Sequence, residues 1–160
     1  MERLATVIIP AKNEGPTIGR VVQAARQARW VDEVIVVDGY STDDTVIEAR
    51  KAGAKVVMQS KRGYPAKGIG MRDGFRAART DVIAYVDADI VNISPDMIER
   101  LLEPVIIDEA DFVKGTFERA EGRVTELVAK PLLKMFFPEA AGFPNRSAGK
   151  SRASAGSSSR

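Results

Sequence analysis

Residues 84–90 read AYVDADI, and this stretch decides the fold because it leads a buried strand into two acidic side chains. The apolar run 82–86 predicts a strand, and Asp87 and Asp89 follow it. In an extended chain alternate side chains share a face, so both carboxylates would point the same way. Two like charges there repel each other and resist desolvation. A divalent cation, Mg²⁺ or Mn²⁺, would remove both problems and could hold a diphosphate.

The same Asp-x-Asp pattern also fits a surface loop with two solvated aspartates, one of them capping a helix. For two aspartates taken alone, the surface loop is the more common arrangement. The choice between a metal site and a solvated loop therefore depends on the rest of the chain.

Three further apolar runs predict strands at residues 6–9, 34–37 and 56–58, and we expect Pro10 to end the first. Helices are predicted from apolar residues at helical spacing, and they cover residues 16–28, 41–52, 70–79 and 94–102. In the third of these helices, the apolar face would be Met71, Phe75 and Ala78. Strands that alternate with helices indicate an α/β domain with a largely parallel sheet. Beyond it we expect a strand at 111–117 and a helix at 125–137, interrupted at Pro131.

Parallel sheets bind ligands beyond the carboxyl ends of their strands. Three predicted strand ends carry suitable residues, namely 10–14 (PAKNE), 38–39 (DG) and 87–89 (DAD). Glu14 fits a helix cap or a contact to a base or ribose equally well, and Asp38 fits capping or ligand binding. The agreement of three strand ends is stronger evidence than any one of them.

A basic loop lies between the third and fourth predicted strands. Lys61, Arg62 and Lys67 could be solvated, or a mobile lysine could contact a diphosphate beside the acidic pair. Gly68, Gly70 and Gly74 follow, but their spacing does not match a dinucleotide-binding loop. We therefore expect a flexible loop and a helix start there.

Composition narrows the class of protein. The 160 residues fit one domain, no run of about 18 apolar residues predicts a membrane span, and the N-terminus has no signal-peptide pattern. The absence of Cys excludes disulfides and is compatible with a cytoplasmic protein. The absence of His removes the commonest general base and metal ligand.

The net charge of +2 depends on the last 21 residues. Residues 140–160 hold four basic and no acidic side chains, which leaves 20 basic against 22 acidic in residues 1–139. The body therefore has no basic face that predicts nucleic-acid binding. The Ala, Gly, Ser and Arg composition of 140–160 predicts disorder, so we divide the chain into a domain at 1–139 and a tail at 140–160.

Together the motifs at 7–14, 34–45 and 86–89 resemble nucleotide-sugar glycosyltransferases of the GT-A fold. Ala66-Lys67-Gly68 and above all residues 122–133, GRVTELVAKPLL, are similar to glucosyl-3-phosphoglycerate synthases and their mannosyl relatives. The resemblance covers roughly residues 5–139. It implies transfer of glucose or mannose, with retention of configuration, from a UDP- or GDP-linked sugar to 3-phosphoglycerate. It also implies a Mg²⁺ or Mn²⁺ cofactor.

The resemblance assigns a role to each matching position. Asp87, Asp89 and Lys67 would be catalytic, with Asp89 as the metal ligand and Lys67 on the diphosphate. Arg123, Val124 and Thr125 would bind the acceptor, although an ordinary helix start fits them as well. The residues that would bind the nucleotide sugar are Pro10, Ala11, Glu14, Asp38, Gly39, Lys67, Asp87 and Ala88.

The sequence departs from this family after Glu139. The family continues with a Gly-rich sugar-binding loop, an acidic residue near the reacting sugar and a His that completes the metal site. We therefore expect a GT-A domain that is truncated at its C-terminus. The alternatives are a catalytically defective nucleotide-binding fragment and an enzyme that acts on a lipid phosphate. The apolar residues of 127–137 are typical of a helix for a larger core or a subunit contact, and without that cover we expect either a homodimer or aggregation.

Overall fold

The computed structural model describes residues 4–62 and 67–115. The chain divides into two compact units, residues 1–109 and 110–160, and every described helix and strand lies in the first. The elements alternate along the chain in the order β1 (Ala5–Ala11), α1 (Gly15–Gln27), β2 (Val31–Asp38), α2 (Thr45–Lys51), β3 (Lys55–Met58), α3 (Lys67–Ala77), β4 (Val82–Tyr85) and α4 (Pro95–Ile106).

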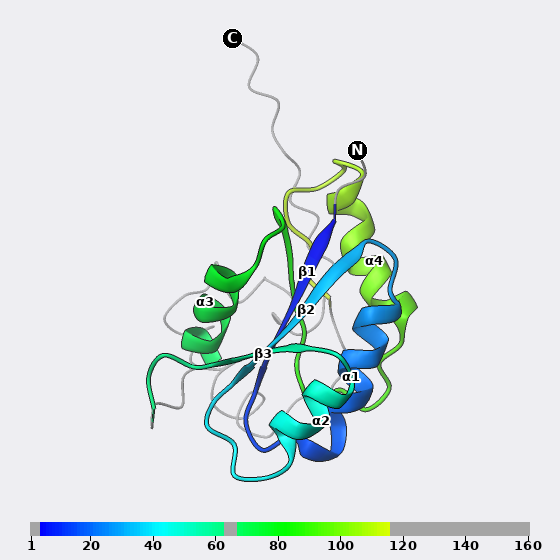
Figure 1. Cartoon of the computed structure of the whole chain (residues 1–160). Coiled ribbons are helices and arrows are strands. Elements are labelled where there is room, and N and C mark those ends of the chain that lie inside the picture. The colour runs from blue at the N-terminus through cyan, green and yellow to red at the C-terminus, as the bar shows by residue number, and fades with distance from the viewer. Residues whose placement is uncertain (1–3, 63–66, 116–160) are drawn as a thin grey trace, which may run out of the picture. The chain divides into compact units, whose positions relative to one another are not determined.

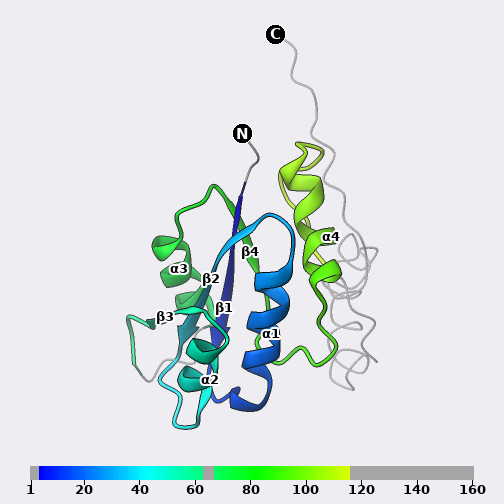
Figure 2. The same ribbon diagram turned by 45° about the vertical axis from the view of Figure 1, so that its right-hand side comes forward.

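The four strands form one parallel sheet in the order β3-β2-β1-β4. Helices cover both faces, with α3 on one side and α1, α2 and α4 on the other (Figure 1). Figure 2 shows the sheet and the helices on its two faces from a second direction. The prediction of an α/β domain with a parallel sheet is therefore confirmed.

The core follows the alternation of side chains along the strands. Val7 and Ile9 of β1 pack into the cluster that includes the apolar face of α1, whereas Ile8 points into a second cluster on the α3 side. The apolar residues predicted for α1, from Ile18 to Ala25, are all buried. Their burial fixes α1 against the sheet and sets the place of the loop that precedes it.

Pro10 does not end β1, contrary to the prediction. The strand continues to Ala11, with Pro10 opposite Val37 of β2. On the other side, the β4 ladder ends at the pair Ile8 and Tyr85, so Pro10 has no β4 residue beside it. A missing N–H is tolerated where no ladder bond is lost, which is why proline fits at this position.

The predicted apolar face of α3 is wrong at Phe75, whereas Ala78 packs against the second core cluster as predicted. Phe75 is 59% exposed, whereas the buried residues of α3 are Gly70, Asp73 and Gly74. A Cβ built on Gly74 would lie 2.3 Å from Cγ2 of Ile8, so only glycine lets the helix approach β1 this closely. The helix also begins at Lys67, three residues before the predicted start.

α2 begins at Thr45, four residues after the predicted start at 41, whereas the predicted helix boundaries at Ser94 and Gly53 agree with the structure. Ser94 caps α4 by accepting a hydrogen bond from the Met97 amide, as the Ser-Pro start indicated. Gly53 follows α2 with a φ of 93°, which suits a glycine at the end of a helix. Residues 111–115 form no strand, and the remainder of that predicted strand lies outside the described residues.

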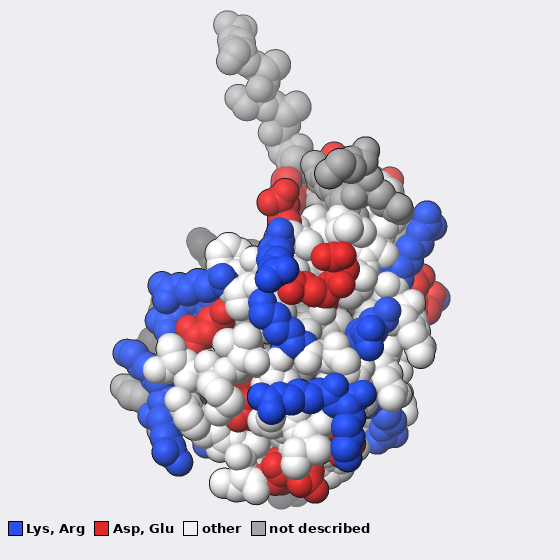
Figure 3. Space-filling model, viewed as in Figure 1, with Lys and Arg blue, Asp and Glu red and all other residues white. Residues whose placement is uncertain are grey.

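The structure adds two observations about the surface and about membranes. On the face seen in Figure 3, basic and acidic side chains lie among one another rather than in separate patches. Within residues 4–62 and 67–115, no helix has both the length and the apolar character needed to cross a bilayer. The predicted helix at 125–137 and the tail at 140–160 lie outside the described residues.

Candidate functional site

A pocket of about 280 Å³ lies at the carboxyl ends of the strands. It combines residues that follow all four strands, as expected for a parallel sheet. Its lining residues are Pro10, Ala11, Lys12, Glu14, Val37, Gly39, Gln59, Lys67, Asp87, Ala88 and Asp89.

The acidic pair reaches this pocket by a route that differs from the prediction. β4 ends at Tyr85, and residues 88–89 form a turn rather than an extended strand. Asp87 is half-buried and Asp89 is exposed, yet both line the pocket. Both residues therefore reach the pocket through the segment after β4 and its turn, not through strand alternation.

Lys67, the first residue of α3, joins the acidic pair. Its amino group donates a hydrogen bond to Oδ1 of Asp87, and the two side chains are 60% and 44% exposed. An exposed ion pair contributes little to stability, so both groups can exchange partners at low cost. The basic loop therefore brings one cation to the pocket.

Glu14 precedes α1, but its side chain makes no capping hydrogen bond. Burial raises the pKa of Glu14 above its ordinary value, and the nearby negative charge of Asp89 raises it further. The helix-cap interpretation of this carboxylate is therefore not realised. Glu14 instead adds a third carboxylate to the lining of the pocket.

Asp38 plays a structural part. Its side chain is only 1% exposed, and its oxygens accept hydrogen bonds from the Ser41 amide (3.0 Å) and the Ser41 hydroxyl (2.6 Å). The neighbouring Gly39 lines the pocket, whereas Asp38 is not among the lining residues. Asp38 thus fixes the turn after β2, and its predicted contact with a nucleotide stays a prediction.

Hydrogen bonds tie the loop after β1 to the loop after β2. The Asn13 amide donates to Ser41 Oγ at 2.9 Å, and Thr42 returns a bond from its amide to Asn13 Oδ1 at 2.9 Å. The Glu14 amide donates to Thr45 Oγ1 at 2.8 Å. These bonds fix the loop that carries Glu14 to the turn that carries Gly39.

Asp43 completes this connection. Its carboxylate accepts hydrogen bonds from the Thr45 hydroxyl and, at 3.0 Å, from the amides of Thr45 and Gly15. These bonds, the Thr45 hydroxyl first, lower the pKa of Asp43. The Ser-Thr-Asp-Asp-Thr run therefore holds the start of α1 as well as the start of α2.

The sequence reasoning missed two polar lining residues, Lys12 and Gln59. Lys12 lies inside the 10–14 motif, and Gln59 directly follows β3. The place of Gln59 after a strand was the available signal. The predicted acceptor residues, Arg123, Val124 and Thr125, lie outside the described residues.

Several solved and curated proteins are similar to this chain. It is 40% identical over 156 residues to glucosyl-3-phosphoglycerate synthase of Mycolicibacterium smegmatis, a match that covers 86% of this chain and 52% of that protein. The chain therefore spans about half the length of that curated relative.

Two crystal structures of glucosyl-3-phosphoglycerate synthase from Mycobacterium tuberculosis share the fold, each at 35% identity. A complex with Mn²⁺, UDP-glucose and phosphoglyceric acid has a TM-score of 0.75 and covers 92% of this chain and 55% of that one. A complex with Mg²⁺ and UDP has a TM-score of 0.74 and the same coverage. These matches confirm the predicted GT-A fold.

A protein-family profile matches most of the chain. The profile described as glycosyl transferase family 2 matches residues 6–150, which include every described element from β1 to α4 apart from Ala5, the first residue of β1. The pocket, the parallel sheet and the similar structures agree with this match. The chain belongs to glycosyltransferase family 2.

Proposed function

We propose that the chain binds a nucleotide sugar in the pocket and that its protein transfers glucose from UDP-glucose to 3-phosphoglycerate. The observation that carries this proposal is the meeting of Lys67, Asp87 and Asp89 with the β1 and β2 loops in one pocket. The M. tuberculosis relative with the same fold was solved with UDP-glucose and phosphoglyceric acid, which favours this donor and acceptor. A mannosyl or GDP-linked donor stays a prediction from the sequence.

The proposed reaction exchanges one bond for another. The bond between the anomeric carbon of glucose and the diphosphate breaks, and a bond to the hydroxyl group of 3-phosphoglycerate forms. The hydroxyl proton is released, and UDP leaves with the electron pair of the broken bond. Lys67 would donate to the diphosphate, where negative charge develops.

The acidic pair suits a divalent cation. Within the described part of the chain, no three acidic or histidine side chains gather into a complete metal site. Asp87 and Asp89 still fit, because Mg²⁺ is commonly held by one or two carboxylates together with phosphate oxygens and water. We keep the main ligand role at Asp89, as the resemblance implied, and note that Asp87 pairs with Lys67 before a donor binds. The bound ion would neutralise charge on the diphosphate.

The loops after β1 and β2 would hold the nucleoside. Pro10, Ala11 and Gly39 provide apolar and backbone surface, and the Glu14 carboxylate can accept a hydrogen bond from a ribose hydroxyl or a base. The Ala88 side chain is buried beside the acidic pair. These contacts need little adjustment on binding, because the network from Asn13 to Thr45 already fixes both loops.

We retain the sequence-based prediction for the acceptor. Arg123, with Val124 and Thr125, would bind 3-phosphoglycerate, since a guanidinium can contact a phosphate or carboxylate in two places. Titration of 3-phosphoglycerate in the presence of UDP and Mn²⁺ tests this. Arg123→Ala should abolish binding and Arg123→Lys should restore part of it, while UDP affinity stays unchanged. Equal binding by all three proteins would contradict the assignment.

The activity itself is tested by UDP release from UDP-glucose, Mn²⁺ and 3-phosphoglycerate. The proposal expects UDP release only when the acceptor and the metal are both present. Release with a lipid phosphate but not with 3-phosphoglycerate would favour the alternative acceptor. Metal-dependent UDP binding without turnover would favour the alternative of a nucleotide-binding protein. A homodimer and a cytoplasmic location stay predictions from the sequence.

A further inference from the structure

Asp73 is a buried carboxylate in α3 that takes no part in the proposed reaction. It is 8% exposed, and it precedes Gly74, where the helix approaches Ile8 of β1. A charge in such a position costs free energy unless hydrogen bonds and an opposite charge compensate it. The partners of Asp73 therefore indicate what the carboxylate does.

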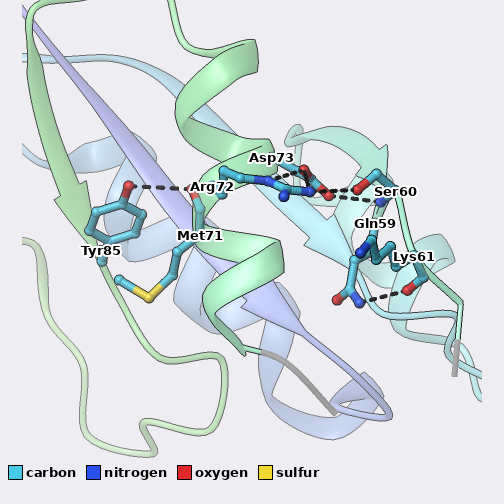
Figure 4. Close-up of polar contacts among 7 residues, drawn as sticks. All are labelled: Gln59, Ser60, Lys61, Met71, Arg72, Asp73 and Tyr85. Carbon is cyan, nitrogen blue, oxygen red and sulfur yellow. Dashed lines mark hydrogen bonds and ion pairs between the residues drawn. The ribbon is translucent and has the colours of Figure 1, made fainter. Parts of the chain in front are cut away.

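These partners join α3 to the segment that follows β3. Oδ2 of Asp73 accepts a hydrogen bond from the Ser60 amide at 2.7 Å, and Oδ1 accepts one from Arg72 at 3.0 Å (Figure 4). Arg72 also donates to Ser60 Oγ at 2.9 Å. We call these three bonds the Asp73 clamp. Because Ser60 lies just after β3 and Asp73 lies inside α3, the clamp closes the connection between the two elements.

Two other contacts hold the same part of α3. The Tyr85 hydroxyl of β4 donates to the Met71 carbonyl at 3.3 Å (Figure 4). Gly70 lies against β1, since a Cβ built on it would be 3.2 Å from Cβ of Pro10. The first turns of α3 are therefore fixed to β1 and β4, and the clamp adds the connection to the carboxyl end of β3.

This part of the helix carries Lys67 to the pocket. Lys67 is the first residue of α3 and lies about 9 Å from Asp73 along the helix axis. Since the hydrogen bonds of a helix make it stiff, a displacement at Asp73 also moves Lys67. A long side chain loses conformational freedom when it binds a ligand, and a fixed helix start lowers that cost.

We infer that Asp73 is a positioning residue for donor binding, which fixes the start of α3 through Ser60 and so holds Lys67 where the diphosphate binds. This inference rests on the proposed function. Charge and position predict opposite effects, because a carboxylate repels an anionic ligand. Loss of Asp73 should strengthen UDP binding if only its charge matters, and should weaken it if its hydrogen bonds matter.

The test is calorimetric titration of UDP into the whole chain with Mn²⁺ present. Asp73→Ala should weaken UDP binding several-fold. Asp73→Asn loses the same charge but keeps an oxygen that can accept from the Ser60 amide, so it should retain most of the wild-type affinity. Thr6→Val is a control for lost stability, because Thr6 is fully buried, bonds to Glu33 and Thr80, and does not line the pocket. It should leave UDP affinity unchanged.

A double variant tests whether Asp73 acts through Lys67. Lys67→Met combined with Asp73→Ala should bind UDP within about twofold of Lys67→Met alone, whereas independent sites would multiply their losses. Arg72→Met removes two bonds of the clamp at a side chain that is 44% exposed, so the fold should tolerate it. It should bind UDP more weakly than Arg76→Met, which removes the same charge at another exposed position of α3.

The outcomes separate this inference from the proposed function. An Asp73→Ala protein that binds UDP as tightly as the wild type, or more tightly, would overturn the inference, and so would multiplied losses in the double variant. If Asp73→Ala does not fold, equal affinities of Arg72→Met and Arg76→Met would overturn it. In each case UDP binding by the wild type would still support the proposed function. If the wild type does not bind UDP with Mn²⁺, the proposed function fails and the inference fails with it.

Discussion

The amino group of Lys67 donates a hydrogen bond to Oδ1 of Asp87, which joins the first residue of α3 to the segment after β4. Lys67 lies in the connection between β3 and β4, and Asp87 lies in the segment that follows β4. Both residues line the pocket. In the proposed function Lys67 exchanges this partner for the donor diphosphate. The pair therefore marks the charged end of the site before a ligand arrives.

Replacing Lys67 by Met should weaken UDP binding in the presence of Mn²⁺ by about tenfold or more, the usual loss for a hydrogen bond to a charged group. Lys51→Met is a matched control, because Lys51 is also an exposed lysine paired with a carboxylate, that of Glu48. Calorimetry of both variants checks the expectation. Equal losses in the two proteins would show that Lys67 acts only through net charge.

Gly74→Ala should destabilise the fold by about 1–3 kcal/mol, because the added Cβ would overpack the contact with Ile8. Gly19→Ala is the control, since nothing lies within 4 Å of a Cβ at that position in α1. That substitution should stabilise the protein by about 0.4–1 kcal/mol. Urea unfolding measures both, and a Gly74→Ala protein as stable as the wild type would contradict the close approach of α3 to β1.

Asp73→Asn should lower stability at neutral pH and lose this effect in acid. The hydrogen bond from the Ser60 amide, together with Arg72, holds the pKa of Asp73 below its ordinary value of 3.8. A lowered carboxyl pKa contributes stability above the unfolded-state pKa, and this contribution is lost as the pH falls through the folded-state pKa. The difference in free energy of unfolding between the wild type and Asp73→Asn should therefore be largest at pH 7 and should decrease below about pH 3.8.

Urea unfolding between pH 7 and pH 3 measures this difference in free energy of unfolding, with Asp32→Asn at an exposed position as the control. A difference that stays constant over the whole pH range would show that Asp73 stabilises the fold through its packing rather than through its charge.

Much of the fold could be predicted because it follows from apolar runs. Val34 to Val37 and Val82 to Tyr85 are strands in the structure, and their alternation with helices was sufficient to indicate a parallel sheet. Such runs report burial directly. The edge of the sheet at which the pocket lies then follows from the common direction of the strands.

The packing of α3 could not be predicted in the same way. Apolar spacing favoured Met71 and Phe75 as the buried face, but the helix approaches β1 through Gly70 and Gly74. Glycines carry no hydrophobic signal, so a close approach between backbones leaves no apolar pattern in the sequence. The burial of Asp73 was hidden for a related reason, because its partner Ser60 lies 13 positions away.

The site was predicted in part for similar reasons. Local motifs located Glu14, Asp87 and Asp89, which all line the pocket. Asp38 turned inward because Ser41, three residues later, satisfies both of its oxygens. Gln59 carries no motif, and only the strand order shows that it faces the same pocket as the acidic pair.

The central claim is that Asp89 binds a divalent cation that the nucleotide requires. Calorimetric titration of UDP into the wild type and into Asp89→Ala, each with Mn²⁺ and with a chelator, tests it most directly. The wild type should bind UDP only when Mn²⁺ is present, and Asp89→Ala should bind UDP weakly and equally under both conditions. Equal affinity of the wild type for UDP with and without Mn²⁺ would contradict it.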